Sequence, residues 1–186
     1  MKKILLWAVI AIIALSFDTF SVSAKDIPSG IRMEIAEDEE DDNVFSIFTY
    51  KDEDGTMGYY LGLGNEFNIS EAFDIEILGG SLSHIDEVCL KLGETADEAL
   101  VALDGLLALL DKDVNTFVDL PARLTTGAES LSGPTTITCT VRKKLIGGKY
   151  LQFCFLGEQL SEVNLSKSSI KFLKKALQID MKRSKK

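Results

Sequence analysis

Two stretches of sequence decide the fold class: Asp54-Gly-Thr-Met-Gly-Tyr-Tyr-Leu-Gly-Leu-Gly64 and Ile146-Gly-Gly-Lys-Tyr-Leu-Gln-Phe-Cys-Phe-Leu-Gly157. Each joins a glycine-containing turn to a run of aromatic and aliphatic residues, which is typical of the returning strand of a β-hairpin. The sequence therefore predicts one hairpin in each half of the chain. The predicted strand pairs are 44–50 with 57–63, and 137–142 with 149–156.

Each hairpin is followed by further short strands and then by a helix. Thr95-Ala-Asp-Glu98 matches a capping box, so a helix is expected to begin there. Its apolar arc is wider than the roughly 100° stripe of a surface helix, which predicts either a core helix or one covered by a second layer or a partner. Ser166 is expected to cap a second helix that runs to about Met181, with Phe172 on its apolar, buried side. The further strands are expected at 73–77, 88–92, 116–124 and 162–165.

The repeated order of hairpin, strands and capped helix predicts an α+β fold, with antiparallel sheet packed by two helices. It also suggests a duplicated β-hairpin/strand/helix unit, in which a single domain over 44–186 has similar halves 44–112 and 113–186. Residue identity between the halves is low. The residues carry no motif that identifies a family, and this layout does not by itself imply a function.

Residues 1–24 resemble a cleavable signal peptide. A cationic start precedes an apolar run from Ile4 to Leu15, and Val22-Ser23-Ala24 supplies a cleavage site. The run is shorter than the roughly twenty residues that span a bilayer. We therefore expect export to the periplasm or the extracellular space, with no transmembrane segment in the mature chain. Residues 25–43 are predicted to be a flexible acidic lead-in, because a run of like charges favours solvent.

Charge divides the chain unevenly. The whole chain has a formal charge of −9, but residues 25–133 carry 25 acidic and 6 basic side chains, whereas 134–186 carry 12 basic and 3 acidic ones. This asymmetry predicts interaction surfaces of opposite sign, or two halves that attract each other during folding. A basic surface near the C-terminus could bind an anionic surface, although such a run is more often a solvated tail. The tail has no interleaved aromatic residues, so nucleic acid is not the favoured partner. The candidate residues are Lys171, Lys174, Lys175, Lys182, Arg183, Lys185 and Lys186.

The three cysteines allow one disulfide, between Cys139 and Cys154 on the two strands of the second hairpin. A two-residue turn would place them opposite each other, but it would put Phe153 on the same face as threonines of the facing strand. A three-residue loop over 146–148 instead pairs Val141 with Phe153 and turns Cys154 to the other face. Three unbridged thiols, buried or half-buried, are therefore favoured.

Signatures of metal binding and catalysis are weak. Asp111, Asp113, Asn115 and Asp119 supply oxygens at loop positions one, three, five and nine, which suits calcium. Thr116 and Ala122 stand where an EF-hand requires glycine and glutamate, so these four residues are only weak metal candidates. The sole histidine, His84, belongs to no recognisable catalytic set, and no nucleophile elbow or phosphate-binding loop is present. No cofactor is expected.

These observations together predict an exported, non-enzymatic binding or interaction protein. The expected partner is another protein or a component of the envelope or extracellular space. Two alternatives remain open: a small secreted hydrolase that uses a carboxylate pair, and an electrostatic anchor to anionic surfaces through the basic C-terminal half.

Overall fold

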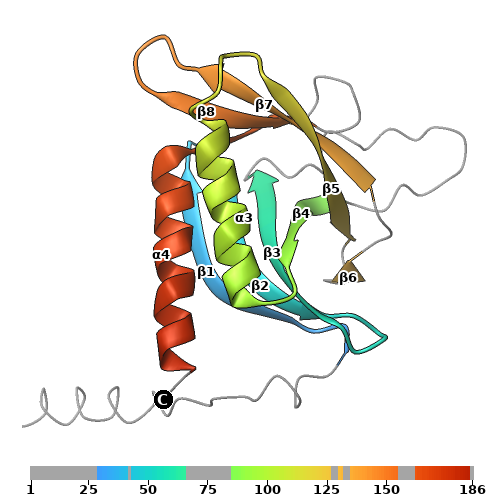
Figure 1. Ribbon diagram of the computed structural model, residues 1–186. Helices are drawn as coiled ribbons and strands as arrows, with labels where there is room; N and C mark the ends of the chain where they lie inside the picture. The colour runs from blue at the N-terminus through green and yellow to red at the C-terminus, as the bar shows by residue number, and fades with distance from the viewer. Residues whose placement is uncertain are drawn as a thin grey trace, which may run out of the picture.

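The computed structural model describes residues 29–41, 43–65, 85–126, 130–131, 135–154 and 162–184. These residues form one antiparallel sheet and two helices (Figure 1). The strands follow one another across the sheet in chain order, except that β6 pairs only with β5. The elements are β1 (Arg32–Glu40), β2 (Asn43–Lys51), β3 (Met57–Asn65), β4 (Ile85–Gly93), α3 (Ala96–Leu109), β5 (Phe117–Thr126), β6 (Ser130–Leu131), β7 (Thr135–Lys143), β8 (Lys149–Cys154), β9 (Glu162–Ser166) and α4 (Lys167–Arg183).

Both helices lie side by side on the same face of the sheet (Figure 1). α3 packs against β4, and α4 packs against β1. In Figure 1, α3 runs upward to β5 and α4 runs downward from β9, so the two helices are antiparallel. Lys174 of α4 forms an ion pair with Asp104 of α3 near the middle of both helices.

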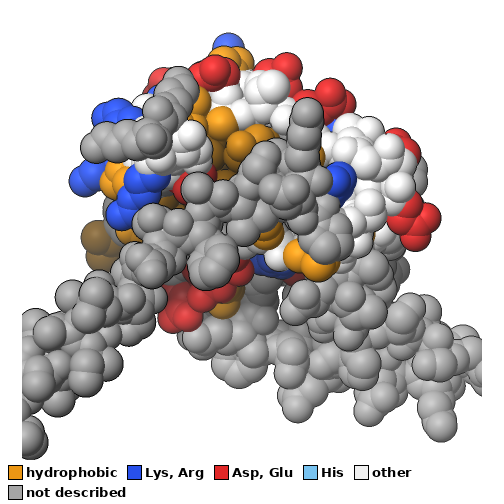
Figure 2. All heavy atoms as spheres, turned by 90° about the horizontal axis from the view of Figure 1, so that it is seen from below, with side chains coloured by type: hydrophobic (Ala, Val, Ile, Leu, Met, Phe, Trp, Pro, Cys, Tyr) orange, Lys and Arg blue, Asp and Glu red, His pale blue; other side chains and the backbone are white. Residues whose placement is uncertain are grey.

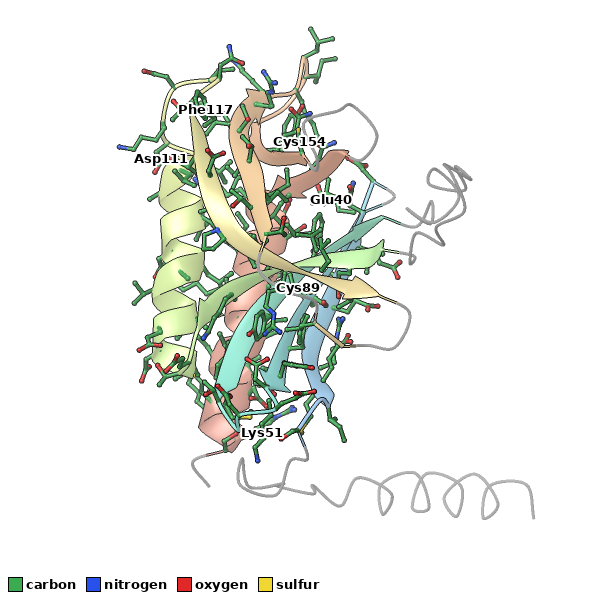
Figure 3. The ribbon with its side chains drawn as sticks, turned by 90° about the vertical axis from the view of Figure 1, so that its right-hand side faces the viewer. Glu40, Lys51, Cys89, Asp111, Phe117 and Cys154 are labelled. Carbon is green, nitrogen blue, oxygen red and sulfur yellow. The ribbon has the colours of Figure 1, made fainter. Side chains whose placement is uncertain are left out.

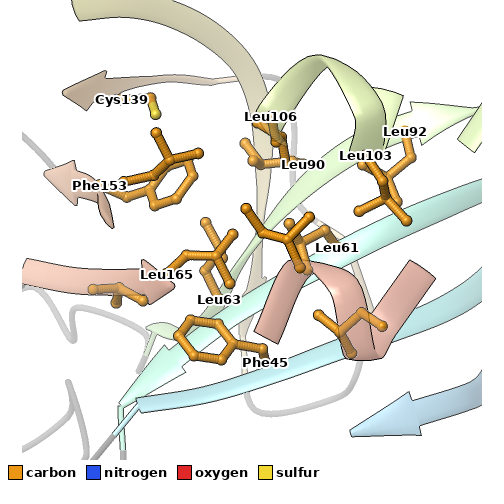
Figure 4. Packing of buried hydrophobic residues seen from close by; sticks show 14 of the residues in the cluster. Phe45, Leu61, Leu63, Leu90, Leu92, Leu103, Leu106, Cys139, Phe153 and Leu165 are labelled. Atoms are coloured by element: carbon orange, nitrogen blue, oxygen red, sulfur yellow. The ribbon is translucent and has the colours of Figure 1, made fainter. Parts of the chain in front are cut away.

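The hydrophobic core fills the space between the helices and this face of the sheet (Figure 4). Alternate residues of each strand point into it, as Phe45 and Ile47 of β2 or Leu61 and Leu63 of β3 do. The helices contribute their inner sides, whose fully or almost fully buried members are Ala99, Leu103, Leu106, Ile170, Leu173 and Leu177. The core therefore receives side chains from both halves of the chain.

Hydrogen bonds between the two halves of the chain also join its last two elements to its first two strands. The Asn164 amide of β9 donates to Asn43 Oδ1 at the start of β2, at 3.3 Å. Ser169, in the first turn of α4, donates to Glu40 Oε2 at the end of β1, at 2.7 Å. The last strand is thereby brought against β2, and the first turn of α4 against the end of β1.

The prediction of a flexible lead-in over 25–43 is wrong for Arg32–Glu40, because these residues form β1 and pair with β2 along its length. Ile35 and Ala36 of β1 pack against the core, and this apolar contact holds the acidic strand on the sheet. The register shift between Glu34 and Ala36 places the neighbours Ile35 and Ala36 both on the core side.

The predicted antiparallel sheet with two packed helices is confirmed, although strands dominate more than the α+β class implied. The order of elements repeats, because β1 to β4 precede α3, and β5 to β9 precede α4. The first unit begins earlier than residue 44, at Arg32. Common ancestry of the units stays a hypothesis, and the predicted strand at 73–77 lies outside the described residues.

Both predicted helix starts are confirmed. Thr95 Oγ1 accepts from the Glu98 amide at 3.2 Å, and Glu98 Oε2 accepts from the amides of Thr95 and Glu94 at 3.2 and 2.7 Å. These donors lower the pKa of the Glu98 carboxyl below its ordinary value of 4.5. Ser166 caps α4 by accepting from the Ser169 amide.

Glu98→Gln is expected to lower the melting temperature at neutral pH and to have a smaller effect in acid. A carboxyl whose pKa is lowered by folding stabilises the folded state above the unfolded-state pKa, and this contribution disappears as pH falls through the folded-state pKa. The measurement is thermal unfolding of both proteins at neutral pH and at pH about 3.

Thr95→Ala serves as the comparison for that experiment. It removes the other half of the capping box, at a cost of about 1 kcal/mol, but keeps the carboxylate. An effect of Glu98→Gln that is equally large at both pH values would contradict the assigned role of Glu98.

Candidate functional site

A charged cluster lies on the face of the sheet opposite the helices. The Arg32 guanidinium of β1 forms an ion pair with Glu87 of β4 and donates to Ser46 Oγ of β2 at 2.7 Å. Ser46 in turn donates to Glu87 Oε1 at 2.9 Å. The guanidinium also lies 3.9 Å from the centre of the Phe48 ring. The cluster therefore connects the first strand to the fourth across β2 and β3.

Gly62 of β3 makes room for this cluster. A Cβ atom at this position would lie 1.8 Å from Glu87 Oε1 and 2.4 Å from Ser46 Oγ. No side chain larger than hydrogen fits while the carboxylate occupies that position. The sequence itself contains a signal for this arrangement, because Gly58, Gly62 and Gly64 share one face of a strand whose other face is apolar.

Cys89 borders the cluster but is poorly suited to nucleophilic chemistry. Its thiol is buried and lies 3.7 Å from Glu87 Oε2. Burial, followed by the nearby Glu87 carboxylate, raises the pKa of Cys89 far above its ordinary value. The thiolate that reactions require is therefore disfavoured, and Cys89 packs as a small apolar residue with Phe48 and Tyr60.

A second charged group stabilises the same face nearer the β2–β3 turn. Arg123 of β5 donates to Asp52 Oδ1 at 2.7 Å and to the Leu131 carbonyl of β6 at 3.1 Å. Its Nη1 also lies 3.4 Å from the Tyr60 hydroxyl. Both charged groups hold strands together from within a mostly buried face, so we assign them to the architecture rather than to binding.

The three cysteines form no disulfide, which confirms the prediction of three unbridged thiols. The predicted pairing of the second hairpin is wrong by two residues. Val141 pairs with Leu151 and not with Phe153, whose partner is Cys139. The turn lies one residue earlier than predicted, with Lys144 and Gly148 joined across it and Gly147 at φ 133°. The predicted faces are nevertheless confirmed, since a two-residue shift leaves every side chain on its side of the sheet. Burial raises the pKa of Cys139 to about 12.

The turn of this hairpin exposes two aliphatic side chains completely. Leu145 and Ile146 have relative exposures of 105% and 93%. Lys143 and Lys144 precede them, and Lys149 follows the two glycines of the turn. Val114 and Phe117, from the neighbouring loop and strand start, are also exposed. We call residues 111–117 together with 142–149 the hairpin end. Figure 3 shows Asp111 and Phe117 at the end of the molecule opposite Lys51.

The hairpin end is held in place by hydrogen bonds at its base. Asn115 and Thr116 exchange backbone bonds of 2.8 Å with Val141 of β7. Arg142 donates to Asn115 Oδ1 at 2.6 Å and to Gln152 Oε1 at 2.8 Å. Lys144 pairs with Asp41, and this contact raises the pKa of the Lys144 ammonium, which stays charged at neutral pH. These hydrogen bonds and the ion pair therefore fix the strands from which the exposed pair Leu145-Ile146 projects.

Two of the four weak metal candidates are hydrogen-bonded to other side chains, and the other two are exposed on a loop. Asn115 accepts from Arg142, and Asp119 accepts from Thr138 at 2.7 Å. Asp111 and Asp113 are exposed on the loop after α3. Within the described ranges, no group of three or more His, Cys, Asp or Glu side chains could hold a metal ion. A cation at this loop would have to compete with the two protein donors.

The candidate residues for binding an anionic surface differ in exposure along α4. Lys171, Lys175, Lys182 and Arg183 are exposed, whereas Lys174 is half-buried against Asp104. Lys185 and Lys186 lie outside the described residues, as does His84. Phe172, which was predicted to lie in the core, is instead exposed, because α4 turns only its Ile170, Leu173 and Leu177 side toward the sheet.

Comparison with protein-family models, with curated proteins and with solved structures gives no match.

Gly62→Ala is expected to destabilise the protein by about 2 kcal/mol or more, because the new methyl group must displace a buried carboxylate or its partners. Chemical denaturation monitored by circular dichroism measures this loss. Gly105→Ala is the matched control, since a Cβ at that helical position meets no atom within 4 Å. It should stabilise the protein by about 0.5 to 1 kcal/mol. Equal effects of the two substitutions would contradict the role given to Gly62.

Proposed function

We propose that this protein is an exported binding protein that attaches to an anionic lipid surface through the hairpin end. The observation that carries the proposal is the complete exposure of Leu145 and Ile146 between lysines. Large aliphatic side chains that stay in water at the tip of a turn add no hydrophobic stabilisation. They supply favourable free energy only where something else covers them. The predicted signal peptide supports a location where the chain could meet such a surface.

The chemistry of the hairpin end suits a lipid layer in two ways. Transfer of a Leu or Ile side chain from water to hydrocarbon contributes up to about 1.5 to 3 kcal/mol each. A lysine near an anionic membrane surface adds about 1 kcal/mol. The hairpin end carries five basic side chains (Lys112, Arg142, Lys143, Lys144 and Lys149) and two acidic ones (Asp111 and Asp113). Asp41 adds a third acidic side chain through its ion pair with Lys144, and the region remains net positive. Such energies give a reversible attachment.

Two features favour lipid over other anionic partners. Leu145 and Ile146 are aliphatic, and they offer no ring on which a nucleobase could stack. They also stand on a projecting turn, which can enter a fluid layer without a preformed pocket in the partner. In the ranges that the structure describes, no helix has the length and apolar content needed to cross a bilayer. The proposal keeps the anionic surface considered from the sequence, but moves the contact from α4 to the hairpin end.

The double variant Leu145→Ser/Ile146→Ser is expected to bind anionic vesicles at least about tenfold more weakly than the wild type, because the hydrocarbon contact is lost. The measurement is co-sedimentation of the purified protein with vesicles of phosphatidylglycerol and phosphatidylcholine. Vesicles of phosphatidylcholine alone should bind the wild type weakly. Added salt should reduce binding to the anionic vesicles without abolishing it.

Ile31→Ser is the matched control for that experiment. Ile31 is also an exposed aliphatic residue, but it precedes β1 beside Gly30, whose amide donates to the Lys51 carbonyl at the opposite end of the molecule. Its substitution should leave vesicle binding unchanged. Equal binding by the hairpin variant and the wild type, or no binding by the wild type to either vesicle, would refute the proposal.

A further inference from the structure

The outer side of the helix layer exposes apolar residues that the fold does not use. Val101 of α3 is 71% exposed, and Phe172 and Ile179 of α4 are 48% and 42% exposed. Phe172 and Ile179 are two helical turns apart and so lie on one side of α4. Because the helices pack side by side, these residues belong to one surface, which we call the outer helix surface.

The two helices contribute exposed charges of opposite sign to this surface. The exposed charged residues of α3 are all acidic: Asp97, Glu98 and Asp104. Those of α4 are all basic: Lys167, Lys171, Lys175, Lys182 and Arg183. Viewed from below, Lys and Arg side chains gather at the left, the side on which Figure 1 places α4, and acidic side chains lie along the upper edge (Figure 2). The surface thus carries acidic side chains on α3 and basic side chains on α4, and the two signs meet between the helices, where Asp104 pairs with Lys174.

We infer that the outer helix surface binds a second copy of this chain, with α3 of each copy against α4 of the other. A two-fold axis parallel to the helices produces this arrangement and makes the interface self-complementary. An axis across the helices would instead place α3 on α3 and α4 on α4, and so bring like charges together. The charge pattern therefore selects both the partner and the orientation.

The levels of the residues along the helices agree with this pairing. Asp104 and Lys174 pair near mid-helix, so in these antiparallel helices the residues before Asp104 lie level with those after Lys174. The two-fold axis preserves these levels. Val101 then faces the partner's Ile179, and Asp97 faces the partner's Lys182. Gly105 has no side chain and Ala108 has only a methyl group, so the surface of α3 is low at these positions. Both lie level with the partner's Phe172.

The same axis places both hairpin ends at one end of the dimer, since each hairpin end lies at the upper end of its helices in Figure 1. Two copies could then contact one surface at once, which strengthens attachment without any new contact within the copy. The dimer itself does not depend on lipid binding, and its test contains no lipid.

Reversal of charge on one helix tests the inference. Asp97→Lys/Asp104→Lys makes both helices basic, and Lys171→Glu/Lys175→Glu/Lys182→Glu makes both acidic. Each variant should self-associate at least about tenfold more weakly than the wild type, because opposed charges become like charges. An equimolar mixture of the two variants should restore the dimer, since each then offers the sign that the other lacks. Sedimentation velocity over a range of concentration and salt measures all of these states.

Lys143→Glu at the hairpin end is the matched control, because it reverses a charge outside the outer helix surface and should leave the dimer unchanged. Circular dichroism confirms that each variant folds, and Phe172→Ser replaces any charge variant that does not. A wild type that stays monomeric up to the highest soluble concentration would overturn the inference. So would variants that dimerise like the wild type, or a mixture that stays monomeric.

Discussion

The burial of one face of the sheet beneath α3 and α4 is the constraint on which the rest of the structure depends. Strands from both halves of the chain send alternate residues into this core, and neither helix could cover it alone. Once the inner sides of the helices are committed to the core, their remaining residues must face outward. The exposure of Val101, Phe172 and Ile179 follows directly from how much of each helix the sheet can cover.

The charge asymmetry of the chain serves the fold and also remains visible at the surface. Lys174 pairs with Asp104, and Lys144 with Asp41, so basic side chains of the second half neutralise acidic ones of the first. These pairs are exposed or only half-buried, and each contributes little stability by itself. Most acidic residues of α3 and basic residues of α4 still face solvent. Ion pairs between the halves therefore coexist with surfaces of opposite sign on the two helices.

Much of the architecture could be read from local patterns. Alternating residues and glycine turns located β2, β3, β7 and β8, and the cap residues Thr95 and Ser166 located both helix starts, because these signals act within a few residues. The acidic strand β1 was missed because like charges in a row suggest solvent, while its place was decided by Ile35 and Ala36 against a distant core. The hairpin register was missed by one step because either glycine of the turn can adopt the required backbone conformation.

The candidate sites were harder to predict than the fold. Ile146 was predicted only as a turn residue, and nothing local shows that the rest of the fold leaves both Leu145 and Ile146 uncovered. Arg32, Ser46 and Glu87 come from three strands, and only the sheet brings them together over Gly62. The sequence by itself determined the two hairpins, the two capped helices, the unequal charge of the halves and the opposite faces on which Cys139 and Cys154 lie. The tertiary structure alone decided which apolar residues stay outside and which distant charges meet, because burial and ion pairing depend on the order in which strands lie across the sheet and not on neighbours along the chain.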